Sequence, residues 1–199
     1  MSHRTVAIAL FDDVEVLDFA GPFEVFSVCG RRHQLDLFHV MTVSERGQAI
    51  HARNSLVVTP THSFASLPPA DIVLIPGGYG TRREMKNPVM LEWVSAVAPR
   101  AELLLSVCTG ALVLGAAGQL DGMRATTHHL AFEELRAAAP NTEVIEDARI
   151  VDNGRIVLSS GVSAGIDMSL HVVAKLHGDD MARECARYME YDGTWSSNA

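Results

Sequence analysis

The sequence predicts an α/β fold in which helices cover both faces of a mostly parallel sheet. Its apolar runs are short and poor in charge, and they alternate with segments that have apolar residues at helical spacing. At 199 residues, with 48% hydrophobic and 20% charged residues, the chain has the size and composition of a compact globular protein. No Pro/Ser-rich linker, repeat or low-complexity segment divides the sequence, so we expect one domain over residues 1–199.

Each predicted element follows from its local pattern. The strands are expected at residues 6–11, 36–43, 72–75, 103–108 and 156–158. The helices are expected at residues 22–29, 87–98, 111–117, 131–139, 163–176 and 180–190, and proline at position 22 suits a first helical turn. Short pairs around Ile50 and Val57, and around Val144 and Val151, are predicted to be hairpins or added arms. Asn153–Gly154 is a strong turn signal.

The charge and cysteine content exclude several classes of function. Twenty-four acidic residues against sixteen Lys and Arg give a net charge of -8, which disfavours nucleic acid and anionic membrane surfaces as partners. Three cysteines at spacings that match no zinc site are too few for a disulfide framework, so a cytoplasmic location is expected. No signal peptide is expected at the N-terminus. The uncharged residues 103–120 contain glycines and change from a strand pattern to a helical one, so they are not predicted to span a membrane.

Cys108 is the leading candidate for chemistry, because an apolar strand ends there and a helix rich in Gly and Ala begins at once. Such a junction resembles a nucleophile elbow, whose tight and strained turn pushes a side chain out over the sheet. The start of a helix favours an anion, so the sequence predicts a lowered pKa for this thiol. The alternative is that Cys108 is a small buried apolar residue, which is what Cys29 and Cys185 are expected to be.

Gly77, Gly78 and Asp18 are candidates for the same site. The paired glycines follow a buried strand and could turn backbone N–H groups toward a ligand, although a plain tight turn explains them equally well. Asp18 is a polar residue in an apolar segment and could cap a helix. If it approaches Cys108, an ionised carboxylate would raise the pKa of the thiol, whereas a protonated carboxyl would donate to the thiolate.

Histidine and aspartate supply weaker candidates elsewhere in the chain. His128 and His129 could provide a general base, but no histidine directly follows Cys108. Asp167 falls in the first turn of a predicted helix, and a favourable interaction with the helix dipole is sufficient to explain it.

Four motifs resemble the ThiJ/PfpI branch of the class I glutamine amidotransferase-like superfamily. They are Pro76–Gly77–Gly78 and the segments 106–110, 112–118 and 124–128. The resemblance extends over nearly the whole chain and implies a flavodoxin-like three-layer α/β sandwich, usually a homodimer, with a cysteine nucleophile and no metal or other cofactor. It implies Cys108 as nucleophile, Asp18 as the acid beside it, Thr109 in the pocket and Gly78 as a backbone donor facing the cysteine. With Gly77 and His128, these residues form the predicted site.

Within that branch the chain most resembles the isonitrile hydratases, which implies a small-molecule substrate. A thiolate and a nearby proton donor are the minimum machinery for adding a nucleophile and a proton to the terminal carbon of an isonitrile. The sequence departs at His129, where an aromatic residue is expected, and at Ser159–Ser160–Gly161, where glycines are expected. Alternatives are a ligand sensor like those of AraC-type regulators, a glyoxalase-type enzyme and a redox sensor. Thr109 in place of a histidine after Cys108 argues against a peptidase.

Overall fold

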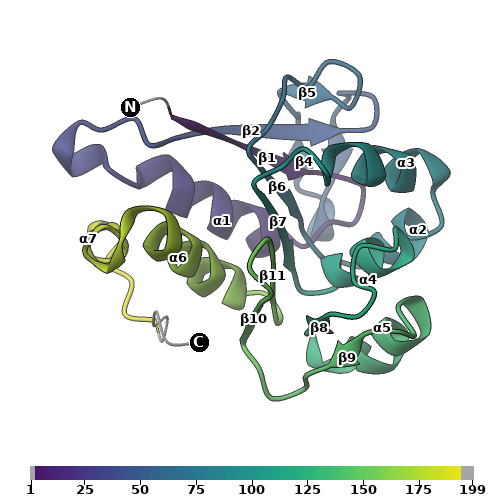
Figure 1. Ribbon diagram of the computed structural model, residues 1–199. Coiled ribbons are helices and arrows are strands. Elements are labelled where there is room, and N and C mark those ends of the chain that lie inside the picture. The colour runs from purple at the N-terminus through teal and green to yellow at the C-terminus, as the bar shows by residue number, and fades with distance from the viewer. Residues whose placement is uncertain (1–2, 194–199) are drawn as a thin grey trace.

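A seven-stranded sheet forms the centre of the protein (Figure 1). The computed structural model describes residues 3–193, so residues 1–2 and 194–199 of the predicted domain lie outside the described part. The strand order is β10-β11-β7-β6-β1-β2-β5, and all neighbouring pairs are parallel except β10 with β11. The strands are β1 (Arg4–Ala9), β2 (Phe38–Ser44), β5 (His62–Ser63), β6 (Ile72–Ile75), β7 (Leu103–Val107), β10 (Ile150–Asp152) and β11 (Ile156–Ser159).

Helices cover both faces of this sheet, which gives the predicted three-layer α/β sandwich. One group packs together as α1 (Val16–Val28), α6 (Ala164–His177) and α7 (Asp179–Tyr188). The other contains α2 (Thr81–Glu84), α3 (Pro88–Val97), α4 (Gly110–Ala116) and α5 (Phe132–Ala138) (Figure 1). The central strands β6 and β7 are buried along their whole length, as their continuous apolar sequences require.

The first helix starts earlier than predicted. It begins at Val16, so Asp18 lies in its first turn and Pro22 lies inside the helix. A Cβ atom on Gly21 would lie 2.9 Å from Cγ1 of Ile166, so this glycine marks the close crossing of α1 and α6. The Gly–Pro pair therefore serves helix packing, and its interpretation as a helix start was wrong.

One of the two predicted short pairs is confirmed and the other was wrong. β3 (Ile50–His51) pairs in antiparallel fashion with β4 (Val57–Val58). Val144 lies in β9 (Glu143–Val144), which pairs with β8 (Arg124–Ala125), whereas Val151 pairs with Leu158 across the Asn153–Gly154 turn. The two valines pair with strands in different sheets, and the local sequence does not indicate these partners.

Residues 103–120 form β7, α4 and the turn that follows, and most of them are buried in the core. No helix within residues 3–193 has the length and apolar composition that a bilayer crossing needs. Three short 3-10 turns complete the described elements: η1 (Arg31–His33), η2 (Arg53–Ser55) and η3 (His129–Ala131).

Candidate active site

Cys108 lies in a strained turn between β7 and α4. Its φ of 57° is in the left-handed region, which residues other than glycine rarely adopt. The backbone around it is held firmly: its N–H lies 3.1 Å from the carbonyl oxygens of both Ser159 and Ser160, and its own carbonyl accepts from Thr127 Oγ1 at 2.8 Å. A Cβ on Gly110 would overlap the Ile75 carbonyl oxygen. The predicted elbow is present, and its glycine is dictated by the close approach of helix and strand.

Asp18 reaches this cysteine from the first turn of α1. Its side chain is completely buried, and its Oδ2 atom accepts a hydrogen bond from the Gly77 N–H at 3.0 Å. Its Oδ2 atom and the Cys108 Cβ both adjoin Gly77, where a Cβ would lie 2.7 Å from the first and 2.8 Å from the second, while its Oδ1 atom is buried without a hydrogen-bond partner. Burial raises the pKa of Asp18 to about 7, although the hydrogen bonds from Gly77 and Cys108 act in the opposite direction.

The thiol of Cys108 has a raised pKa, in contrast to the lowered one that the sequence predicted. Burial, and then the negative charge of Asp18, raise it to about 12. Backbone hydrogen bonds from Thr109 and Val162 lower it, but they are too weak to reverse the shift. The lowered pKa was predicted from the start of the helix. The rise caused by an ionised Asp18 was stated as an alternative, but the burial of Cys108, which is 5% exposed, could not be predicted.

Asp18 and Cys108 therefore share one proton over a wide range of pH. Their pKa values of about 7 and about 12 belong to a pair in contact, so the proton can reside on either group. One arrangement is a thiol beside a carboxylate. The other is a thiolate beside a carboxylic acid, which is a nucleophile with a proton donor at contact distance.

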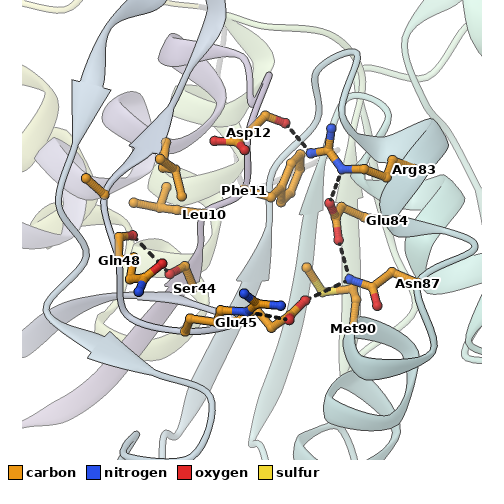
Figure 2. Close-up of a pocket in the computed structure, with 13 residues that line it drawn as sticks. Leu10, Phe11, Asp12, Ser44, Glu45, Gln48, Arg83, Glu84, Asn87 and Met90 are labelled. Atoms are coloured by element: carbon orange, nitrogen blue, oxygen red, sulfur yellow. Dashed lines mark hydrogen bonds and ion pairs between the residues drawn. The ribbon is translucent and has the colours of Figure 1, made fainter.

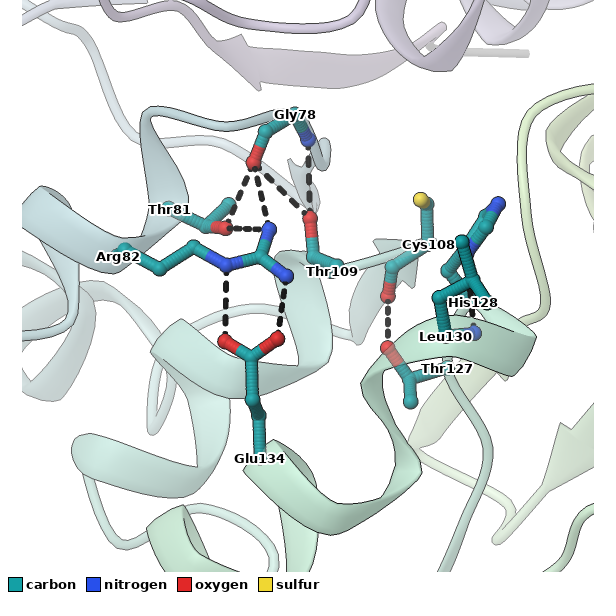
Figure 3. A network of polar contacts seen from close by, with 9 residues as sticks. All are labelled: Gly78, Thr81, Arg82, Cys108, Thr109, Thr127, His128, Leu130 and Glu134. Carbon is teal, nitrogen blue, oxygen red and sulfur yellow. Dashed lines mark hydrogen bonds and ion pairs between the residues drawn. The ribbon is translucent and has the colours of Figure 1, made fainter.

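The glycine loop holds this pair together but offers fewer donors than predicted. The Gly77 N–H binds Asp18, and the Gly78 N–H donates to Thr109 Oγ1 at 2.9 Å, so the Gly78 amide does not face the cysteine (Figure 3). A Cβ on Gly77 would lie 2.6 Å from the Thr109 nitrogen and 2.8 Å from the Cys108 Cβ. Gly77 therefore allows Asp18 and Cys108 to approach each other, and Thr109 anchors the loop through its hydroxyl.

An ion pair that the sequence did not indicate supports the loop from outside. The Gly78 carbonyl also accepts from Thr81 Oγ1 at 2.8 Å and from Arg82 Nη1 at 3.3 Å. Arg82 in turn binds Glu134 with two hydrogen bonds of 2.8 and 2.6 Å (Figure 3). Because Arg82 and Glu134 lie in different helices, no local sequence signal connects them.

His128 lies beside the site but binds elsewhere. Its Nδ1 accepts a hydrogen bond from the Leu130 N–H at 3.2 Å, and its ring lies 4.3 Å from that of His129. The ring packs on Gly161, where a side chain would collide with it. Burial, followed by the charges of His129 and Arg82, lowers the pKa of His128. His128 is therefore an uncharged side chain at the edge of the site at physiological pH.

A cavity of about 410 Å³ is lined by residues that adjoin Cys108, although neither Cys108 nor Asp18 lines it. Its lining includes Ser160 and Val162, whose backbone groups contact the Cys108 amide and thiol, together with His128, His129, Phe132 and Arg149. Val162 has a φ of 51°, an unusual value for a β-branched residue, and sequence reasoning did not single it out. Asp167, predicted to be structural, is buried and binds Arg149 Nε at 2.5 Å and the Tyr191 hydroxyl at 3.0 Å.

A second cavity of about 350 Å³ lies beyond the ends of β1 and β2 (Figure 2). Its polar groups already bind one another: Arg83 donates to Glu84 at 2.9 Å, and Asn87 donates to both Glu45 and Glu84 at 3.0 and 2.9 Å. Among residues 3–193, no three His, Cys, Asp or Glu side chains are grouped to hold a metal ion. We therefore place the candidate active site at Cys108 and its adjoining cavity.

Known proteins resemble this chain over most of its length. The DJ-1/PfpI family profile matches residues 4–175. Isonitrile hydratase from Pseudomonas putida is 33% identical over 94% of this chain and 78% of its own length. The HTH-type transcriptional regulator GbdR of Pseudomonas aeruginosa is 25% identical over 95% of this chain, which spans only 51% of that regulator. A ThiJ/PfpI family protein from Pseudomonas syringae superposes with a TM-score of 0.87 at 26% identity, covering 100% of this chain and 80% of that one.

Proposed function

The chain belongs to the DJ-1/PfpI family, and on that premise we propose that it is a cysteine-dependent enzyme that hydrates isonitriles to N-substituted formamides. The observation that carries the proposal is the contact between Cys108 and a buried Asp18 whose pKa is about 7. The reaction needs a nucleophile and a proton donor at one carbon atom, and this pair supplies both. The similarity to isonitrile hydratase supports the same reaction class.

The first step uses the arrangement in which Asp18 holds the proton. The Cys108 thiolate attacks the terminal carbon of the isonitrile, and Asp18 transfers its proton to that carbon. The product is a thioimidate, in which a C–S bond and a C–H bond have formed, and Asp18 is left as a carboxylate. Its burial without a partner on Oδ1 favours the protonated acid before the reaction.

The second step returns both groups to their starting state. Water adds across the C=N bond of the thioimidate, with hydroxyl on carbon and hydrogen on nitrogen. The C–S bond then breaks, the hydroxyl proton passes to the Asp18 carboxylate, and the N-substituted formamide leaves. Thiolate and carboxylic acid are regenerated together, because a proton from water replaces the one that Asp18 gave to the formamide carbon.

We infer that the substituent of the isonitrile occupies the cavity beside Cys108. The polar groups of His129 and Arg149 face this cavity together with the ring of Phe132, so it suits a substituent with both polar and apolar parts. The homodimer implied by the family resemblance and the cytoplasmic location expected from the cysteine content stay predictions, and light scattering coupled to size-exclusion chromatography would test the dimer.

Ligand sensing is the second candidate function, because the chain matches about half of a transcriptional regulator. The raised pKa of Cys108 would suit a thiol that binds without reacting. In a sensor, Cys108→Ala would leave ligand affinity unchanged, whereas in the enzyme it abolishes turnover.

Mass spectrometry of the products tests the proposal directly. Purified protein is incubated with a panel of alkyl and aryl isonitriles beside Cys108→Ala and, as a matched control, Cys29→Ala, which replaces a buried cysteine outside the site. We expect formamide from the wild type and Cys29→Ala, and at least a thousandfold less from Cys108→Ala. Absence of formamide from the wild type, or equal formation by Cys108→Ala, would overturn the assignment.

A further inference from the structure

The two remaining cysteines form a buried pair far from the active site. Cys29 caps the end of α1 and Cys185 lies on the inner face of α7, and both are almost completely buried. The Cys185 thiol donates to the Val25 carbonyl at 3.4 Å, and the Cys29 N–H donates to the same oxygen at 3.2 Å. One carbonyl oxygen therefore brings together two cysteines that are far apart in the sequence.

The two thiols also interact with each other. The proximity of the two side chains raises the pKa of Cys29 and lowers that of Cys185. The thiolate is the reactive form of cysteine, so ionisation of one member beside the other prepares the pair for oxidation.

We propose that Cys29 and Cys185 form an intramolecular disulfide when the protein meets a hydroperoxide. The Cys185 sulfur attacks the O–O bond, and the peroxide leaves as water or an alcohol while Cys185 becomes a sulfenic acid. The Cys29 sulfur then attacks the sulfenic sulfur, so an S–S bond forms, the S–O bond breaks and water is released. The two sulfurs lose two electrons in total, and the peroxide gains them.

The position of α7 explains how an oxidant reaches a buried pair. Only Ala182, Cys185 and Ala186 of its ten residues are buried, so little apolar surface holds this last helix to α1 and α6. Local opening of such an element costs less than global unfolding and exposes Cys185 transiently. The disulfide would then fasten α7 to α1.

This modification is independent of the proposed activity. Cys29 follows Asp18 by eleven residues, which is about 16 Å along a helix. The cross-link would therefore sit at the end of α1 opposite the active site. The change we expect is in the stability of the oxidised protein.

Peptide mapping after oxidation tests the proposal. The full-length protein is treated with hydrogen peroxide, blocked with N-ethylmaleimide under denaturing conditions and digested without reductant. We expect a peptide linked through Cys29 and Cys185, loss of two of the three free thiols, and a rise in the thermal midpoint that dithiothreitol reverses. Cys29→Ser and Cys185→Ser should each abolish the linked peptide, whereas Cys108→Ser should retain it.

Other products would overturn the proposal. Cys29 and Cys185 recovered as free thiols, a disulfide to Cys108, a link between two molecules, or overoxidation of either cysteine would each contradict it. The wild-type map alone gives this answer, so the conclusion survives if a serine variant fails to fold.

Discussion

The buried carboxyl of Asp18 destabilises the folded protein when it is ionised, and it is also the proton donor of the proposed reaction. Its carboxyl has a pKa of about 7 in the folded protein, against 3.8 for an unperturbed aspartate, because burial disfavours the charge. The folded state therefore binds this proton more tightly than the unfolded state does. The stability that results is fully present below pH 3.8 and is lost as the pH rises through 7, by about 4 kcal/mol in total.

Asp18→Asn should consequently stabilise the protein at neutral pH while removing activity. An amide fits the same space, keeps an acceptor for the Gly77 N–H and carries no charge to desolvate. We expect the free energy of unfolding of Asp18→Asn to exceed that of the wild type by up to about 4 kcal/mol at pH 8, and the difference to shrink toward pH 4. Urea denaturation across this range measures it.

Asp71 provides the matched control for this prediction. Hydrogen bonds from the Thr5 backbone lower the pKa of Asp71, so its ionised form is favoured by folding. Asp71→Asn should therefore destabilise the protein at pH 8, with the opposite sign. If the wild type is as stable as Asp18→Asn at pH 8, then burial of the ionised Asp18 carboxylate does not lower the free energy of unfolding, and the prediction is wrong.

The pH dependence of the reactivity of the Cys108 thiol tests whether Asp18 and Cys108 share one proton. The pair of Asp18 and Cys108 loses its first proton near pH 7, so thiolate paired with carboxylic acid becomes available above that value. We expect alkylation of Cys108 by iodoacetamide, followed by mass spectrometry, to accelerate as the pH rises through 7. In Asp18→Asn this step should move to the higher pKa of the buried thiol alone, and an unchanged profile would contradict the shared proton.

At the scale of elements, the elbow depends on how closely α4 approaches β6. A Cβ on Gly110 would overlap a backbone oxygen, which cannot move aside as a flexible side chain could. Gly110→Ala should therefore cost at least 3 kcal/mol of unfolding free energy or prevent folding. Gly122→Ala is the control, because it meets no atom within 4 Å and only its φ of 72° is unfavourable, at about 1–2 kcal/mol. Equal losses in urea denaturation would refute the steric explanation.

Elements could be predicted from sequence where the signal is local. The strands β6 and β7 are continuous apolar runs, and the turn at Asn153–Gly154 has a strong dipeptide signal. The start of α1 was missed because Gly21 and Pro22 also serve the crossing with α6, a tertiary contact that overrides their helix-start signal. The predicted pairing of Val144 with Val151 failed because strand partners depend on the whole sheet.

The same distinction applies to the candidate site. Cys108, Asp18 and Gly77 could be named from the turn chemistry and the family resemblance, and the structure places them in contact. The direction of the pKa shift at Cys108 could not be predicted from the sequence, because it depends on burial by several elements. Val162 and the Arg82–Glu134 ion pair likewise have no local signal, since each acts through a contact between distant segments.

At the scale of the whole molecule, one polar network joins the segments around the site. Asp167 on α6 binds Arg149, which precedes β10, and Tyr191, which follows α7. The carboxylate is 1% exposed, and these two side chains supply its ion pair and hydrogen bonds. Because Arg149 also lines the cavity beside Cys108, the network links the stability of the fold to the shape of the candidate substrate site.

Removing Arg149 should reveal this coupling. Arg149→Met leaves a buried carboxylate without its cation, and we expect a loss of about 2–3 kcal/mol, reduced from a fully buried pair because the arginine is partly exposed. Arg187→Met, at an exposed position of α7, should change the unfolding free energy by less than about 0.5 kcal/mol. Adding Asp167→Asn to Arg149→Met should recover part of the loss, since the amide has no charge to leave unpaired. Urea denaturation of the wild type, Arg149→Met, Asp167→Asn and the double variant measures this coupling. If the losses of the two single variants add up to that of the double variant, the two side chains are independent and the prediction is wrong.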